Sequence, residues 1–182
     1  EYREMDSFFV GKDCVYVCDM GKRTIYSYSF DGKFLHSLSF PYSLVFNDVV
    51  ELPDGRFLCH RPSQSENCKG LWILDQKGRR VKNLLEYEKG TPCKNSYWNT
   101  LCAQEDGTIK IYNPVDGSYY QYDAVNDTVV RTMRQKSNLP MLADFHCSDR
   151  ELYETKEECT YSLFTVDGKN LVFSLWSFNS AN

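Results

Sequence analysis

Long hydrophobic runs and an excess of positive charge are both absent from this 182-residue sequence. No stretch of 18 apolar residues occurs, so we expect no segment of the chain to cross a membrane as a helix. The first four residues, Glu1 to Glu4, lack the basic start and the apolar stretch of a signal peptide. The net charge of −4 gives no basic footprint, so we expect no nucleic-acid partner.

Signatures of catalysis and of tight metal binding are also scarce. The sequence has only three histidines, His36, His60 and His146, and they are far apart along the chain. No Gly-x-Ser-x-Gly motif is present, so the strained turn that presents a hydrolase serine is not expected. A nucleophile, a base and an oxyanion site within mutual reach are not visible, and the sequence therefore does not favour an enzyme.

Eight cysteines are present, but none forms a Cys-x-x-Cys pair, so their spacing does not support a zinc site. Cys14 and Cys18 fall on one expected strand, about 13 Å apart, which is beyond the reach of a disulfide. We expect most of the thiols to be free, buried and packed as small hydrophobic groups. A bond between Cys68 and Cys93, which lie in two long loops, stays an open alternative.

Aromatic residues are abundant, at 15% of the chain, and they favour β-strands because flat rings pack well on a pleated surface. An apolar residue followed by Asp recurs at Asp31, Asp75, Asp123 and Asp167, at intervals of 44, 48 and 44 residues. This period suits the four-stranded blade of a β-propeller. An aromatic residue precedes each Asp with two residues between them, as packing between neighbouring blades would require: Tyr28, Trp72, Tyr120 and Phe164.

A second set of turns, at Asp13, Asp54 and Asp106, keeps a similar period. Aligning these three residues brings Cys18, Cys59 and Ile111 to the same place, and likewise Tyr16, Phe57 and Ile109. Within each blade the two aligned residues are alternate residues of one strand, as Tyr16 and Cys18 are. We therefore expect both to lie on one buried face, and this face to be equivalent from blade to blade.

The chain is therefore predicted to be all-β, with about four blades of four antiparallel strands in one domain or partial propeller over 1–182. Asp-Gly turns supply the positive φ that tight hairpins need. The repeats cover about 6–40, 42–86, 97–134 and 139–176. The expected strands are 6–12, 14–19, 24–30 and 33–40; 47–53, 56–61, 70–75 and 79–86; 99–105, 108–113, 118–123 and 128–134; and 141–147, 151–156, 160–166 and 170–176.

The segment Ile25-Tyr-Ser-Tyr-Ser-Phe-Asp-Gly-Lys-Phe-Leu35 resembles the third strand and turn of NHL-type repeats. The whole chain resembles six-bladed β-propeller proteins that Bacteroidetes export, often as lipoproteins, and whose function is largely uncharacterised. The resemblance implies an extracytoplasmic location, in the periplasm or at the outer surface, and a chain that forms part of a six-bladed ring. A closed ring of four blades is the alternative, and the length of the chain fits it.

Polar residues that open the innermost strands are the first candidates for a functional site. Asp6, Asn47 and Asn99 share one column of the repeat, and Asp48 follows Asn47. Polar groups that converge on a channel could bind a ligand, although Asn or Asp at a strand start also caps local backbone groups. Oxygen ligands of this kind make a calcium site chemically feasible, whereas no other cofactor is expected.

The loops that would surround the same mouth supply the other candidates. His60 precedes the long connection 61–69 and Arg61 begins it, whereas Tyr97 and Trp98 end the connection 89–98. Exposed aromatic rings can stack on sugars or peptides, although rings at these positions could equally pack between blades. The candidate ligand-binding residues are thus Asp6, Asn47, Asp48, His60, Arg61, Tyr97, Trp98 and Asn99.

Two hypotheses of function follow. The preferred one is a non-enzymatic binding or scaffold propeller of the cell envelope that recognises a protein, peptide or glycan at the channel mouth. The alternative is a metal-dependent propeller hydrolase or lyase with its site at the same mouth. The alternative needs several ligands to converge from successive inner strands, and of the three column residues only Asp6 is charged.

Overall fold

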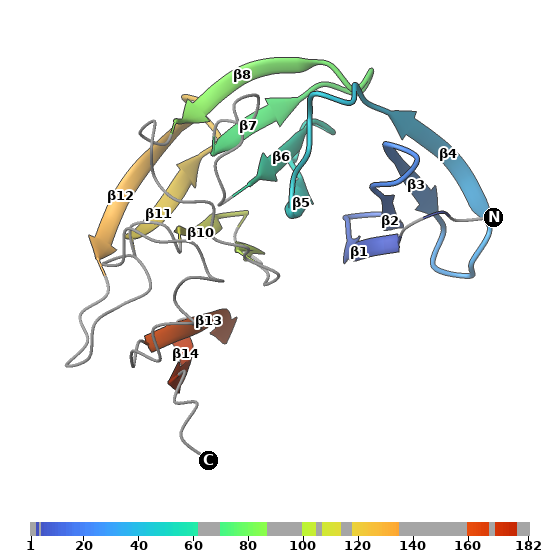
Figure 1. The fold of residues 1–182 in the computed structure, drawn as a ribbon. Helices are drawn as coiled ribbons and strands as arrows, with labels where there is room; N and C mark the ends of the chain where they lie inside the picture. The colour runs from blue at the N-terminus through green and yellow to red at the C-terminus, as the bar shows by residue number, and fades with distance from the viewer. Residues whose placement is uncertain are drawn as a thin grey trace.

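A computed structural model describes residues 3, 5–61, 70–86, 100–104, 107–113, 118–134, 160–167 and 170–177. The described residues form β-strands and turns only, as the repeat predicted. Three antiparallel sheets of four strands and one hairpin follow each other along an open arc (Figure 1). The first three sheets, here called blades 1 to 3, correspond to the first three predicted repeats.

In each blade the strands are neighbours in chain order, as in a propeller. The first strands of blades 1 and 2 lie on the concave side of the arc, and the fourth strands of all three blades form its convex rim (Figure 1). Blade 1 contains β1 (Met5–Val10), β2 (Val15–Asp19), β3 (Thr24–Tyr28) and β4 (Phe34–Ser39). Blade 2 contains β5 (Asp48–Glu51), β6 (Phe57–His60), β7 (Leu71–Leu74) and β8 (Arg80–Leu85). Blade 3 contains β9 (Leu101–Ala103), β10 (Ile109–Asn113), β11 (Ser118–Asp123) and β12 (Thr128–Arg134).

A hairpin of β13 (Thr160–Asp167) and β14 (Asn170–Ser177) follows blade 3. Its strands lie where the third and fourth strands of the last repeat were predicted. The strands predicted at 141–147 and 151–156 lie outside the described residues. All fourteen described strands begin and end within two residues of the predicted limits, because turn residues mark the hairpins so clearly. In the β5–β6 turn, for example, Gly55 has φ +80° and donates its N–H to the Leu52 carbonyl at 2.9 Å.

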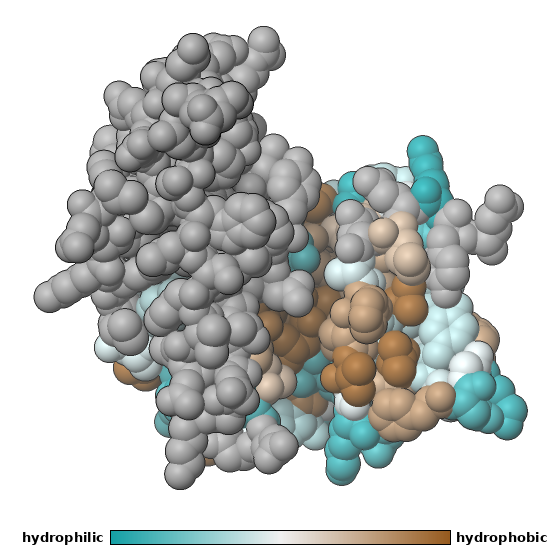
Figure 2. All heavy atoms as spheres, turned by 90° about the horizontal axis from the view of Figure 1, so that it is seen from below, coloured by the Kyte–Doolittle hydropathy of each residue, from teal (hydrophilic) through white to brown (hydrophobic). Residues whose placement is uncertain are grey.

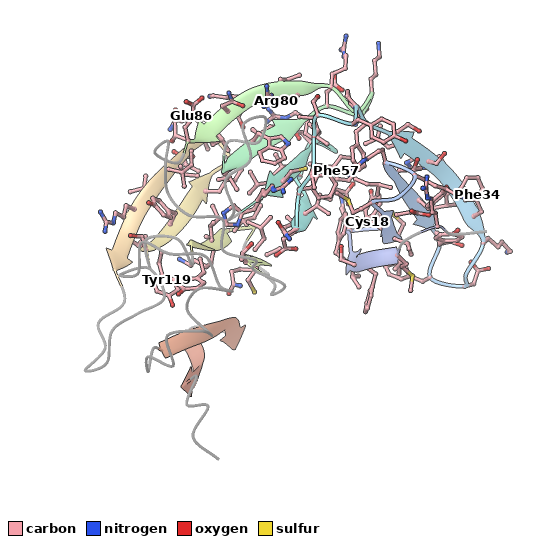
Figure 3. The ribbon with its side chains drawn as sticks, viewed as in Figure 1. Cys18, Phe34, Phe57, Arg80, Glu86 and Tyr119 are labelled. Atoms are coloured by element: carbon pink, nitrogen blue, oxygen red, sulfur yellow. The ribbon has the colours of Figure 1, made fainter. Side chains whose placement is uncertain are left out.

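The apolar core consists of two layers, each between a pair of neighbouring blades. Between blades 1 and 2, Cys18 and Ile25 pack against residues such as Phe57 and Trp72 of blade 2. The labelled side chains of Cys18 and Phe57 lie between these two blades (Figure 3). Between blades 2 and 3 the layer is built from the opposite face of blade 2 and from β9 to β12: Val50, Leu52, Leu58, Leu71, Ile73, Leu101, Ile109, Ile111, Tyr120 and Tyr122, with partly buried Val129 against it. Sheet-on-sheet burial of this kind supplies the main stabilisation of a propeller.

The prediction that Cys18 and Cys59 occupy equivalent faces was wrong. In blade 1, Val10 pairs with Val15 and leaves a four-residue turn, whereas in blade 2 Glu51 pairs with Phe57 and leaves five residues. Side chains alternate between faces along a strand, so a turn shorter by one residue reverses the face of every residue after it.

The corrected register places Val17 of blade 1, and not Cys18, at the position of Cys59 in blade 2. By the same pairing, Tyr26 takes the position of Trp72. Cys18 consequently faces blade 2, and it shares one buried layer with Cys59.

As predicted, the described cysteines are thiols outside any disulfide: Cys14, Cys18 and Cys59 are buried and Cys102 is partly buried. The other four, Cys68 and Cys93 among them, lie outside the described residues, so their state stays a prediction. No helix long and apolar enough to cross a membrane occurs in the described part of the chain.

Candidate functional site

Four of the predicted site residues come together at one end of blade 2. Asp48 begins β5 and His60 ends β6, and the antiparallel pairing places these two residues opposite each other. The Asn47 N–H donates to the His60 carbonyl at 2.9 Å, and Arg61 follows directly in the chain. Asp48 and His60 are buried, whereas Asn47 is exposed and Arg61 is half-buried. We call this end of the inner strands the mouth.

The Asp48 carboxylate joins blade 2 to blade 3. Its Oδ2 accepts the backbone N–H groups of Thr100 at 2.6 Å and of Leu101 at 2.7 Å, at the start of β9. Its Oδ1 accepts the N–H of Val49 at 2.9 Å. Three backbone N–H donors therefore satisfy the hydrogen-bonding capacity of this buried carboxylate, and two of them come from the next blade.

The His60 imidazole forms a second link to the same residue of blade 3. Its Nδ1 lies 2.6 Å from Thr100 Oγ1, and both side chains are buried. Burial lowers the pKa of His60 to about 3, so the ring is neutral at physiological pH.

Asp48 is shifted in the opposite sense, because burial raises its pKa to about 6 while its amide donors oppose the rise. Near pH 7 the site thus holds a neutral imidazole and a carboxylate that is mostly ionised. Since Thr100 is hydrogen-bonded to both, the two groups act as a clamp between blades.

The remaining predicted residues cannot be placed around this clamp. The backbone of Asp6 lies in β1, and Tyr97, Trp98 and Asn99 lie outside the described residues. The expected ring of Asp6, Asn47 and Asn99 therefore stays a prediction, and so does the calcium site. Among residues whose side chains are described, no group of three or more His, Cys, Asp or Glu could hold a metal ion.

Thr100 is the residue of this site that the sequence analysis missed. It lies 52 residues after Asp48, the same interval that separates Asp54 from Asp106, so the repeat alignment already placed it in the column of Asp48. An ordinary threonine carries no signal of its own, and only its contact with Asp48 and His60 reveals its role.

Two further polar links between blades were also missed. The Tyr16 hydroxyl donates to Glu51 Oε1 at 2.8 Å, which joins β2 to the end of β5. Arg56 donates from Nη1 and Nη2 to the two carboxylate oxygens of Asp127, each at 2.8 Å, which joins blades 2 and 3. These partners are 35 and 71 residues apart. Such separations give no local pattern that a single sequence could reveal.

Solved structures resemble the chain in fold. A Bacteroides fragilis protein inferred to be exported shows a TM-score of 0.74 at 15% identity over 98% of this chain and 54% of its own. Hydrazine synthase of Kuenenia stuttgartiensis shows a TM-score of 0.51 at 12% identity, over 97% of this chain and 47% of its own. The chain thus spans about half the length of these structures, and at such identities the likeness shows the fold alone.

A third structure, virginiamycin B lyase of Staphylococcus aureus with quinupristin, is 11% identical over 72% of this chain and 41% of its own. Its TM-score of 0.47 is too low to support an argument. No curated protein matches the sequence. The family described as 6-bladed beta-propeller, in contrast, matches residues 1–173, nearly the whole chain. The sequential four-stranded blades and this match agree: the chain belongs to that family of six-bladed β-propellers.

Proposed function

We propose that this chain is a non-enzymatic binding module that recognises a protein, peptide or glycan through the mouth. One observation carries the proposal: the carboxylate of Asp48 and the imidazole of His60, the groups described at the mouth that are suited to acid–base catalysis, are buried and hydrogen-bonded to Thr100 of the next blade. General acid–base catalysis needs such groups within reach of a substrate. Here they fix the geometry of the mouth, while Asn47 and Arg61 reach the surface beside them.

We further propose that the protein acts in the cell envelope, outside the cytoplasm. The resemblance to exported Bacteroidetes propellers supports this location, and so does the likeness to the Bacteroides fragilis protein inferred to be exported. A rigid scaffold with exposed polar groups at one end of its strands suits recognition of another molecule, because loops and strand ends on a fixed framework need little ordering when they bind.

The binding hypothesis is tested by applying the fluorescently labelled chain to glycan and peptide arrays. The double variant Asn47→Ala/Arg61→Ala is expected to lose the signal on the probes that the wild-type chain binds. Lys77→Ala, on the exposed β7–β8 turn of blade 2, is the matched control and is expected to bind normally. Equal binding by all three proteins would show that the mouth is not the binding surface.

The competing metal-enzyme hypothesis predicts a different result. Crystals soaked in calcium or manganese would then show anomalous signal beside Asn47 and Asn99, the two asparagines of the predicted polar column. The binding hypothesis expects no ordered metal there, so a bound ion with two or more protein oxygen ligands would overturn the non-enzymatic assignment.

A further inference from the structure

An arginine and a tyrosine lie together at the mouth end of the strands. Arg23 ends the β2–β3 turn, and Tyr42 lies in the connection 40–47 that leads from β4 to β5. The strand pairing places both segments at the same end as Asn47, because β2 and β4 end there and β5 begins there. The guanidinium carbon of Arg23 lies over the Tyr42 ring, 5.2 Å from its centroid. We call these two residues the mouth pair.

The Tyr42 ring is held at the surface by a fixed connection. Phe40 and Phe46 flank it and are buried in the layer between blades 1 and 2, with their ring centroids 5.0 Å apart. The Leu44 N–H donates to the Pro41 carbonyl at 2.9 Å and closes a turn around Tyr42, which is 74% exposed. A ring presented in this way loses little conformational freedom on binding. Exposure alone does not make a site, because hydrophobic atoms also reach the surface elsewhere on blade 1, on the right of the view from below (Figure 2).

Arg23 distinguishes this ring from the other exposed ones. Its backbone has φ +55°, a left-handed conformation that is unfavourable for a residue with a Cβ atom. Among the described non-glycine residues only Asp127 also has a positive φ, and there hydrogen bonds from Arg56 and Tyr122 to the side chain offset the strain. Within the described part of the chain, the Arg23 side chain gains no such bond.

The guanidinium of Arg23 therefore has donors that this part of the protein does not use. Within the described residues its Nε is enclosed without an acceptor, and its two Nη groups, which are not enclosed, form no hydrogen bond or ion pair. An arginine that only stabilised its turn would be expected to find an acceptor, as Arg56 does in Asp127. Residues 20–23 and 40–47 contain two cationic residues and no acidic one. The mouth pair thus presents a positive charge to an anion.

We propose that the mouth pair binds an acidic sugar unit of a glycan, with the sugar carboxylate on the Nη groups of Arg23 and the sugar ring against the uncovered part of Tyr42. A guanidinium donates two parallel N–H groups to a carboxylate. An aromatic ring packs against the apolar face of a pyranose. A uronic acid carries both groups on one ring, and so matches a cation and an aromatic ring that lie side by side.

An acidic peptide fits the mouth pair less well. Peptide recognition uses a sheet edge, a groove or pockets for successive side chains. The cavity described on this chain is lined by residues of blade 3 such as Gln121 and Thr132, and not by the mouth pair. The inference rests on the proposed function, because it names the ligand class of the mouth. An oligosaccharide that begins at the mouth pair would reach Asn47, which ends the same connection.

The test is isothermal titration calorimetry of the whole chain with trigalacturonate and trimannuronate, and with their methyl esters, which have the same rings but no charge. We expect at least one acid to bind about tenfold or more tightly than its ester, because only the acid forms a charge-assisted bond with the guanidinium. Arg23→Met and Tyr42→Ser are each expected to weaken that binding about tenfold or more. Arg80→Met, the matched control on the exposed rim of blade 2, is expected to bind like the wild type (Figure 3).

Arg23→Gly separates a binding role from a structural one. Glycine adopts φ +55° without strain, so this variant is expected to melt at the wild-type temperature or a few degrees above it, while it loses binding. Unchanged binding by Arg23→Met and Tyr42→Ser, or a loss of binding that always accompanies a lower melting temperature, would give the mouth pair a structural role and overturn the proposal.

The choice of ligand has its own contrary results. A wild-type chain that binds neither acid, or binds the esters equally well, would overturn the proposal, and so would equal binding of oligoglutamate. The array keeps this inference apart from the proposed function. Binding that is lost in Asn47→Ala/Arg61→Ala but kept in Arg23→Met and Tyr42→Ser would refute the mouth pair alone. The reverse pattern would refute the role of Asn47 and Arg61 and leave the mouth pair standing.

Discussion

The buried carboxylate of Asp48 should give the protein an unusual response to acid. Its pKa lies at about 6 in the folded chain, against an ordinary value of 3.8. The folded state therefore binds the proton more tightly than the unfolded state does. For this group the free energy of unfolding is highest below the unfolded pKa, and this contribution is lost as the pH rises through about 6.

The size of the effect follows from the shift. One pKa unit corresponds to about 1.36 kcal/mol, so the full difference is about 3 kcal/mol, and about 2 to 3 kcal/mol of it develops between pH 7.5 and pH 4. Asp48→Asn keeps the shape of the side chain but removes the titration. We expect the unfolding free energy of the wild type to rise, relative to that of the variant, by this amount on acidification.

The measurement is urea denaturation of both proteins at several pH values, followed by fluorescence of the tryptophans, of which Trp72 lies buried between blades 1 and 2. Taking the difference between the proteins cancels the titration of His60, which is common to both. A difference that stays constant from pH 7.5 to pH 4 would refute the raised pKa. A difference of opposite sign would mean that the amide donors of Val49, Thr100 and Leu101 outweigh burial.

Three further predictions concern the links between blades. Gly78→Ala should lower the free energy of unfolding by about 2 to 5 kcal/mol, since the residue has φ +73° and its added Cβ would lie 2.0 Å from a carbonyl oxygen of β4. Gly32→Ala is the control, because φ is +84° there but the space around the added Cβ is open, so only the backbone cost of about 1 to 2 kcal/mol is expected. Thermal melts of both variants measure the two losses of stability. A double-mutant cycle on Arg56→Ala and Asp127→Ala should give a coupling of about 1 kcal/mol, because each side chain is about a quarter exposed to solvent; additive effects would disprove the link. The ring proton signals of His60 should not titrate between pH 7.5 and pH 5 in an NMR experiment, because burial holds its pKa at about 3; a midpoint near 6.5 would show that the ring reaches water.

Local patterns predicted the strands well, but in blade 1 they did not predict which side chains of a strand pack against the neighbouring blade. Asp-Gly turns and strand alternation depend on neighbours in the chain, and the strands of blades 1 to 3 lie close to their expected limits. The face of Cys18 depends on whether its turn holds four or five residues. Aligning on Asp13 and Asp54 without a gap concealed that difference, and the strict two-residue period of a strand turned a small error into a reversed face.

The site was predicted in part for a similar reason. Asp48 and His60 were found because of their places in the chain: Asp48 follows Asn47 of the polar column, and His60 stands just before the long connection at the expected mouth. Their partner Thr100 could not be identified, since the contact joins two blades across 52 residues. What the pair does was also hidden. Asp48 and His60 are twelve residues apart in the sequence, and only the structure shows that they lie opposite each other and bind the backbone and hydroxyl of the next blade.

The two halves of the Asp48 clamp are synthesised one after the other. During synthesis β5 and β6 leave the ribosome before Thr100 and Leu101 exist, and β5 and β6 can pair with each other without them. Until the next blade is made, the carboxylate stands in water and keeps its charge. Docking of β9 then removes it from water and gives it its two amide donors in one event. Blade 2 in this way presents an acceptor that is already in place when the first strand of blade 3 docks.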